Sequence, residues 1–77
     1  MINRVELKEK INPFYNKMKG ICFIDYEILD AGYFGVSVKL KTNFLPYEFI
    51  CELSSFHDKE RINISISAEN ENIYILY

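Results

Sequence analysis

The residues that could do chemistry are few, and they are scattered along the chain. The only histidine, His57, is followed directly by Asp58, and such a pair resembles part of an acid/base dyad. Adjacent residues in a strand or turn usually point apart, however, and a catalytic base must be oriented by a third group in a cleft that excludes water. We therefore interpret the polar run that starts at His57 as a solvated hairpin tip.

The two cysteines, Cys22 and Cys51, do not form a redox or metal motif. They lack CxxC spacing and both fall on faces predicted to be buried, so we interpret them as reduced core thiols. One histidine and two separated cysteines are too few to hold a structural zinc ion, and the glycines are explained by turns rather than by a phosphate-binding loop. We predict that the protein is not an enzyme and that it binds neither a metal nor another cofactor.

Basic residues are concentrated in the first twenty positions. Five basic residues stand there against two acidic ones, a net charge of +3, whereas the remainder has four basic and nine acidic residues, a net charge of −5. A basic helix face can follow a phosphate backbone, but the acidic remainder would repel one. Nucleic-acid binding is therefore an alternative that ranks below protein binding. The basic-face candidates are Arg4, Lys8, Lys10, Lys17 and Lys19.

A helical head, residues 1–20, should position these charges. Asn3 followed by Glu6 predicts a capping box at its start, and Gly20 predicts its end. Pro13 lacks an N–H and crowds the preceding turn, so either the helix kinks there or a second short helix begins. The apolar stripe expected to be buried consists of Leu7, Ile11, Phe14, Tyr15 and Met18.

From residue 21 to residue 77 the apolar period changes to two, which predicts a β-rich body. A three-residue loop at residues 30–32 would join the first two strands and place Ile28 opposite Phe34. The loop length and the two apolar faces agree on this register.

The last two strands give a similar prediction. A four-residue loop at residues 68–71 would place Ile66 opposite Ile73. Residues 44–56, which lie between the two hairpins, fit both a strand and a helix that has Pro46 near its first turn. The aromatic and β-branched residues in this stretch favour the strand.

These elements predict a single α+β domain over residues 1–77. An N-terminal helical segment packs on a four- or five-stranded, mostly antiparallel meander sheet, with the strands in chain order. A second hydrophobic core could not be filled from so few residues. No apolar stretch approaches the roughly 18–20 residues that a membrane span requires, and the first nineteen residues are charged and lack the apolar region of a secretory signal. We expect a cytoplasmic protein without a membrane partner.

In such a meander the C-terminal strand, residues 73–77, is a sheet edge without lysine, proline or a bulge. We therefore predict a homodimer that forms through this strand and the apolar outer face beside it. A contiguous apolar surface of this kind usually marks a protein contact. The interface candidates are Phe23, Phe44, Ile50, Tyr74, Leu76 and Tyr77.

The predicted function is a small non-catalytic protein-binding module that occludes or regulates a partner protein. Inhibitors, immunity proteins and phage counter-defence proteins act in this way, and the Ile-, Asn- and Lys-rich composition is typical of AT-rich genomes, their phages and mobile elements. Two alternatives stay open. One is a nucleic-acid-binding module that uses the basic helix, and the other is a homo-oligomeric protein that binds a small ligand between its subunits.

Overall fold

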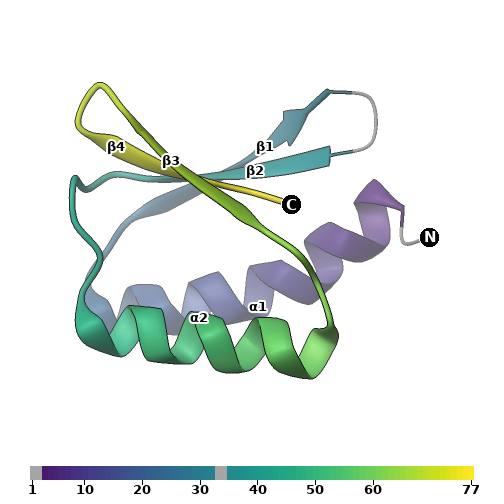
Figure 1. Cartoon of the computed structure of the whole chain (residues 1–77), viewed down its shortest axis with the longest axis horizontal. Coiled ribbons are helices and arrows are strands. Elements are labelled where there is room, and N and C mark those ends of the chain that lie inside the picture. The colour runs from purple at the N-terminus through teal and green to yellow at the C-terminus, as the bar shows by residue number, and fades with distance from the viewer. Residues whose placement is uncertain (1–2, 33–34) are drawn as a thin grey trace.

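The computed structural model describes residues 3–32 and 35–77. Two helices lie side by side on one face of a four-stranded antiparallel sheet (Figure 1). The predicted α+β class, with an N-terminal helix packed on an antiparallel sheet, is confirmed. The elements in chain order are helix α1 (Arg4–Cys22), strands β1 (Tyr26–Ala31) and β2 (Gly35–Leu40), helix α2 (Tyr47–Glu60), and strands β3 (Ser65–Glu69) and β4 (Asn72–Leu76).

Helix α1 begins at the predicted capping box. The Asn3 side chain accepts a hydrogen bond from the backbone N–H of Glu6 at 2.8 Å and donates one to the Glu6 carboxylate at 3.2 Å. The helix then continues through Pro13 as a single element. It also runs past Gly20, because Phe23 adopts the left-handed conformation and its N–H closes the helix on the Lys19 carbonyl at 3.0 Å. The predicted end at Gly20 is therefore wrong.

The apolar stripe of α1 packs toward the sheet and α2, as predicted. All five of its residues are buried, and they meet the inward-facing side chains of the two central strands. The largest fully buried side chains of the core are Tyr15, Phe49, Ile11, Met18, Leu40, Ile75, Val36 and Val38.

In both hairpins the predicted residues face the core, but the pairing register differs from the predicted one. Ile28 pairs with Val38, whereas the expected partner, Phe34, lies outside the described residues. Ile66 pairs with Ile75 instead of Ile73. Both slips are by an even number of residues, so each strand keeps its apolar face toward the core.

The second hairpin slips because its turn is shorter than predicted. Only Asn70 and Glu71 form it, and their φ angles of 51° and 65° are both positive. Two positive φ values are the signature of the tight type I′ turn that joins two twisted antiparallel strands.

Residues 44–56 contribute to a helix, α2, so the strand that we favoured there is wrong. Pro46 stands at the N-cap of α2 in an extended conformation. Phe49, Leu53 and His57 follow at helical spacing and are buried. As a helix the segment buries Phe49 and Leu53 in the core, and this tertiary burial outweighs the local strand preference.

The strand order is β1-β2-β4-β3, which departs from chain order. The C-terminal strand is therefore interior: Tyr74 of β4 pairs with Lys39 of β2 on one side and with Ser67 of β3 on the other. The predicted dimer edge at residues 73–77 is wrong, because both sides of β4 are already paired. The edges are β1 and β3. Within the described residues, neither helix is long and apolar enough to cross a membrane.

Candidate protein-binding surfaces

The five basic-face candidates all take part in ion pairs with acids elsewhere in the chain. The pairs are exposed, so each contributes little to stability. Together, however, they neutralise much of the charge on which phosphate binding would depend. The pairs are Arg4 and Lys8 with Asp30, Lys10 with Glu60, Lys17 with Glu52, and Lys19 with Asp25.

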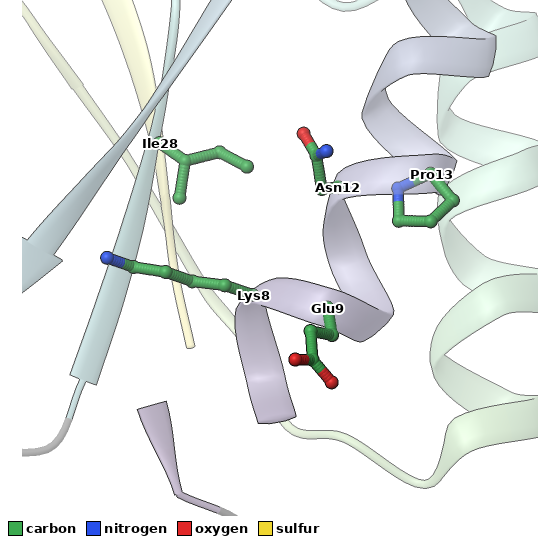
Figure 2. Close-up of a pocket in the computed structure, with 5 residues that line it drawn as sticks. All are labelled: Lys8, Glu9, Asn12, Pro13 and Ile28. Atoms are coloured by element: carbon green, nitrogen blue, oxygen red, sulfur yellow. The ribbon is translucent and has the colours of Figure 1, made fainter. Parts of the chain in front are cut away.

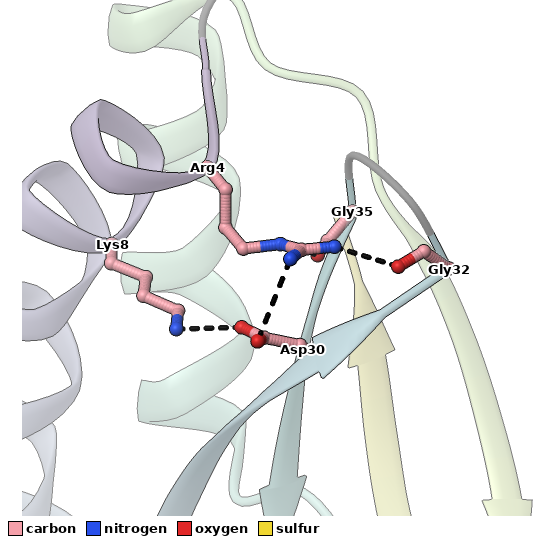
Figure 3. Close-up of polar contacts among 5 residues, drawn as sticks. All are labelled: Arg4, Lys8, Asp30, Gly32 and Gly35. Atoms are coloured by element: carbon pink, nitrogen blue, oxygen red, sulfur yellow. Dashed lines mark hydrogen bonds and ion pairs between the residues drawn. The ribbon is translucent and has the colours of Figure 1, made fainter.

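Two of these cations fasten the start of α1 to the β1–β2 hairpin (Figure 3). The Arg4 guanidinium donates to the carbonyls of Gly32 at 2.6 Å and Gly35 at 3.1 Å, and it lies 3.5 Å from the Asp30 carboxylate. The Lys8 ammonium lies 2.6 Å from the same carboxylate and, through this hydrogen bond, holds the pKa of Asp30 below its usual value. Arg4 and Lys8 therefore have a structural role that the sequence did not suggest.

A shallow hollow of about 530 Å³ opens between α1 and β1 (Figure 2), where Ile28 faces the side chain of Asn12. Its polar lining is largely engaged, since Lys8 bonds to Asp30 and the side-chain Oδ1 of Asn12 accepts a hydrogen bond from the Tyr26 hydroxyl at 3.0 Å. A ligand would find few free groups here. The lining residues are Lys8, Glu9, Asn12, Pro13 and Ile28.

His57 is buried on α2, so the predicted solvated hairpin tip is wrong. Its exposed fraction is only 9%, and its Nε2 lies 3.4 Å from the Tyr77 hydroxyl, which in turn lies 2.6 Å from the Tyr15 hydroxyl. Burial lowers the pKa of His57 and raises the pKa of both tyrosines, so all three groups are neutral near pH 7. The His57 Nδ1 is buried and has no hydrogen-bond partner among the residues that the structure describes. We assign this chain of contacts to the core.

His57 also lines an apolar groove between α2 and β3, with a volume of about 270 Å³. We call it the α2–β3 groove. Ile66, on the outermost strand, forms part of its wall and is 52% exposed. The lining consists of Leu45, Ile50, Leu53, Ser54, His57, Asp58, Ile64 and Ile66.

A second apolar surface lies where α1 ends and α2 begins. Phe23, Phe44 and Tyr47 are 88%, 64% and 80% exposed, and we call these three residues the aromatic end. A hydrogen bond of 3.0 Å from the Lys41 N–H to the Asp25 carbonyl joins the two loops that carry Phe23 and Phe44. The three side chains therefore project from adjacent segments at one end of the molecule.

The structure divides the six interface candidates among several surfaces. Phe23 and Phe44 belong to the aromatic end, and Ile50 lines the groove. Tyr77 is turned toward the core, where it contacts Tyr15 and His57. The remaining two, Tyr74 and Leu76, alternate with buried residues of β4 and so face the side of the sheet that the helices leave open (Figure 1).

Sequence reasoning missed Tyr47 and Ile66, because the strand template placed both on core faces. A helix over residues 44–56 would have predicted that Tyr47 is exposed, because on a helix this residue lies outside the apolar stripe that contains Phe49 and Leu53. Cys51 belongs to the same correction, because it is exposed on α2 and is not a core thiol.

The other cysteine, Cys22, is half-buried at the end of α1. Burial, with the nearby carboxylates of Glu48 and Glu52, raises the pKa of its thiol. Both cysteines are free. A raised pKa keeps Cys22 in the less reactive thiol form near neutral pH.

Among residues 3–32 and 35–77, no three histidine, cysteine, aspartate or glutamate side chains gather where they could hold a metal ion. Comparison with protein-family models, with curated proteins and with solved structures finds no match to the chain.

Proposed function

We propose that the protein is a non-catalytic protein-binding module, and that a partner protein docks on the aromatic end. The observation that carries this proposal is the exposure of Phe23, Phe44 and Tyr47 at one end of a chain of 77 residues. Aromatic side chains that are removed from water in an interface commonly supply most of its binding energy. The module would act by occluding or regulating the surface to which it binds.

The backbone holds these aromatic residues in place before any partner arrives. Phe23 is fixed in the left-handed conformation that ends α1, a geometry that costs a residue other than glycine roughly 1–2 kcal/mol. The Thr42 hydroxyl bonds to the carbonyl of Phe44 at 3.2 Å and accepts from its N–H at 3.4 Å. Tyr47 is the first residue of α2. A backbone that is already ordered loses less entropy on binding, which favours affinity.

The partner, on this proposal, is cytoplasmic. Both cysteines are free thiols, as is usual in a reducing compartment. The composition supports a role in a phage, a mobile element or their bacterial host, where inhibitors and immunity proteins of this size act. We also expect the chain to pair with a second copy of itself, because the sheet has an uncovered edge in β3.

Affinity capture from the cells that express the protein, with cross-linking and mass spectrometry, tests the role of the aromatic end. The wild type should retain one partner protein in stoichiometric amount. The double variant Phe23→Ser, Phe44→Ser should lose it, whereas Val5→Ser should keep it, because Val5 is 65% exposed but lies in the first turn of α1. Failure of the wild type to capture a stoichiometric partner, or equal capture by both variants, contradicts the proposal.

A further inference from the structure

Strand β3 is the edge of the sheet that is best suited to pair with another strand. Within residues 3–32 and 35–77 it pairs only with β4, and all five of its residues are exposed. It contains neither lysine nor proline, the residues that most often protect a sheet edge. The other edge, β1, carries the charged Glu27 at its second position, and its Asp30 is held by α1.

The two ends of β3 carry charges of opposite sign. Among the residues that the structure describes, the cations outside ion pairs are Lys39, Lys59 and Arg61, and the last two precede β3. Glu69 ends the strand and Glu71 follows it in the turn, and neither forms an ion pair with another described residue. A copy of β3 that runs antiparallel to this one therefore brings cations against acids at both ends.

We propose that two copies of the chain pair antiparallel through β3, about a two-fold axis at Ile66. The two four-stranded sheets then form one continuous sheet. This register sets Ile66 opposite its own copy and Ile64 opposite Ala68 of the second copy. At both ends of the paired strands it also brings Arg61 of each copy toward Glu71 of the other, so the interface is complementary to itself in charge as well as in apolar character.

The neighbouring register, centred on Ser67, fits less well. It would set the apolar Ile64 against the polar Asn70 of the second copy and would displace Arg61 from Glu71 by two residue positions. Facing pairs of unlike character contribute less to sheet stability than apolar or oppositely charged pairs do. Side-chain chemistry therefore selects the register centred on Ile66.

Pairing about Ile66 also covers the α2–β3 groove. Ile66 pairs with the fully buried Ile75, so Ile64, Ile66 and Ala68 share the side of the sheet that faces the helices. The matching side chains of the second copy lie on the same side and extend the apolar layer below both α2 helices. The pairing therefore satisfies the free backbone groups of β3 and removes exposed isoleucine from water.

This inference deepens one part of the proposed function, the expected self-association, and it does not depend on the partner site at the aromatic end. The residues of the aromatic end lie at the end of α1, in the segment that leads into α2 and at the first position of α2, and none of them belongs to β3. A monomer could bind a partner there. The two proposals can therefore fail separately.

Sedimentation velocity over a series of concentrations tests the dimer. The wild type should be dimeric by about 100 µM, and Ile66→Arg should weaken the association by about 100-fold or more, because it buries two unpaired cations at the axis. The variant should keep the circular dichroism spectrum of the wild type, since Ile66 is already half-exposed. The control Val5→Arg, at an exposed apolar site on α1, should dimerise normally.

Charge exchange tests the register. Arg61→Glu and Glu71→Arg each set like charges against each other twice, and each should weaken the dimer by roughly 10-fold. The double variant Arg61→Glu, Glu71→Arg should restore it. An equimolar mixture of the two single variants should form the heterodimer, because one variant carries acids at both positions and the other carries arginines. Glu27→Arg, on the opposite edge, should have no effect.

A wild type that stays monomeric at about 100 µM overturns the inference. Single exchanges without effect, or a double variant that is weaker than either single one, overturn it equally. If the protein is monomeric but still captures its partner through the aromatic end, only the dimer is wrong. If the exchanged charges rescue the dimer but the wild type captures no partner, only the partner proposal is wrong.

Discussion

The hydroxyl of Tyr15 lies 2.6 Å from the hydroxyl of Tyr77, and this contact joins the first helix to the residue that follows the last strand. The Tyr77 hydroxyl also lies 3.4 Å from the Nε2 of His57 on the second helix. Three elements that are distant in sequence therefore share one partly buried polar contact. Its partners are neutral near pH 7, so it contributes through hydrogen bonding and packing rather than through charge.

Replacing Tyr77 by phenylalanine should destabilise the fold. The change leaves the largely buried Tyr15 hydroxyl and the His57 Nε2 without their partner, which should cost about 1–3 kcal/mol. For a domain of this size, a loss of 1 kcal/mol lowers the midpoint of thermal unfolding by roughly 4–8 °C. Tyr74→Phe is the matched control, since Tyr74 lies in β4, three residues before Tyr77, and faces away from the helices. Equal effects of the two changes on urea unfolding would contradict the role of the contact.

Burial of His57 should make stability depend on pH. Burial lowers its pKa in the folded state below the ordinary value of 6.5, so the unfolded chain binds the proton more readily. The contribution of neutral His57 is complete above that value. It is lost as the pH falls from 6.5 through the folded-state pKa. Urea midpoints measured between pH 7.5 and 5 should therefore decrease for the wild type.

The variant His57→Asn provides the control, because it removes the proton-binding group. Its unfolding midpoint should be nearly independent of pH over the same range, whatever its absolute stability. Asp25 and Asp30 do not interfere, because their lowered pKa values place their effect below about 4. An equal slope in the two proteins would show that another group is responsible.

Two glycine-to-alanine changes should have opposite effects. A Cβ at Gly35 would lie 2.7 Å from the Ala31 carbonyl oxygen, a backbone atom, so Gly35→Ala should lower the free energy of unfolding by about 1–3 kcal/mol. A Cβ at Gly20 meets nothing within 4 Å, and Gly20 lies inside α1. Gly20→Ala should therefore stabilise the protein by roughly 0.5–1 kcal/mol. Thermal unfolding of both variants checks the pair, and the same sign for both would refute it.

The sequence predicted the first helix well and the second poorly, for a physical reason. Asn3 and Glu6 carry a cap that depends only on neighbouring residues, whereas residues 44–56 satisfy both the helical and the strand period. Contacts with residues distant in sequence favour the helix. The ring centroid of Phe49 lies 6.2 Å from that of Phe14 and 6.1 Å from that of Tyr15. Such a contact leaves no local pattern.

The strand registers and the burial of His57 also depend on contacts between residues that are distant in sequence. A strand that slips by two residues keeps its apolar face, so the alternation predicted the faces of Ile28 and Ile66 but not their partners. Nothing near His57 indicates that Tyr77, twenty residues later, closes over it. The sequence shows that basic residues are concentrated in the first twenty positions, but it does not show that they form ion pairs with acids elsewhere in the fold.

The forked guanidinium of Arg4 should hold the β1–β2 hairpin by its geometry as well as by its charge. One guanidinium reaches the carbonyls of Gly32 and Gly35, on either side of the β1–β2 connection, and the Asp30 carboxylate as well. Arg4→Lys keeps the charge but replaces the planar, forked donor with a single ammonium group, which cannot span both carbonyls in the same way. We expect faster amide hydrogen exchange in β1 and β2, with a loss of global stability of only about 0.5–1 kcal/mol. Lys10→Gln, which removes the exposed pair with Glu60, should leave exchange in both strands unchanged. If Arg4→Lys protects these amides as well as the wild type does, charge alone holds the hairpin and the forked geometry of Arg4 is dispensable.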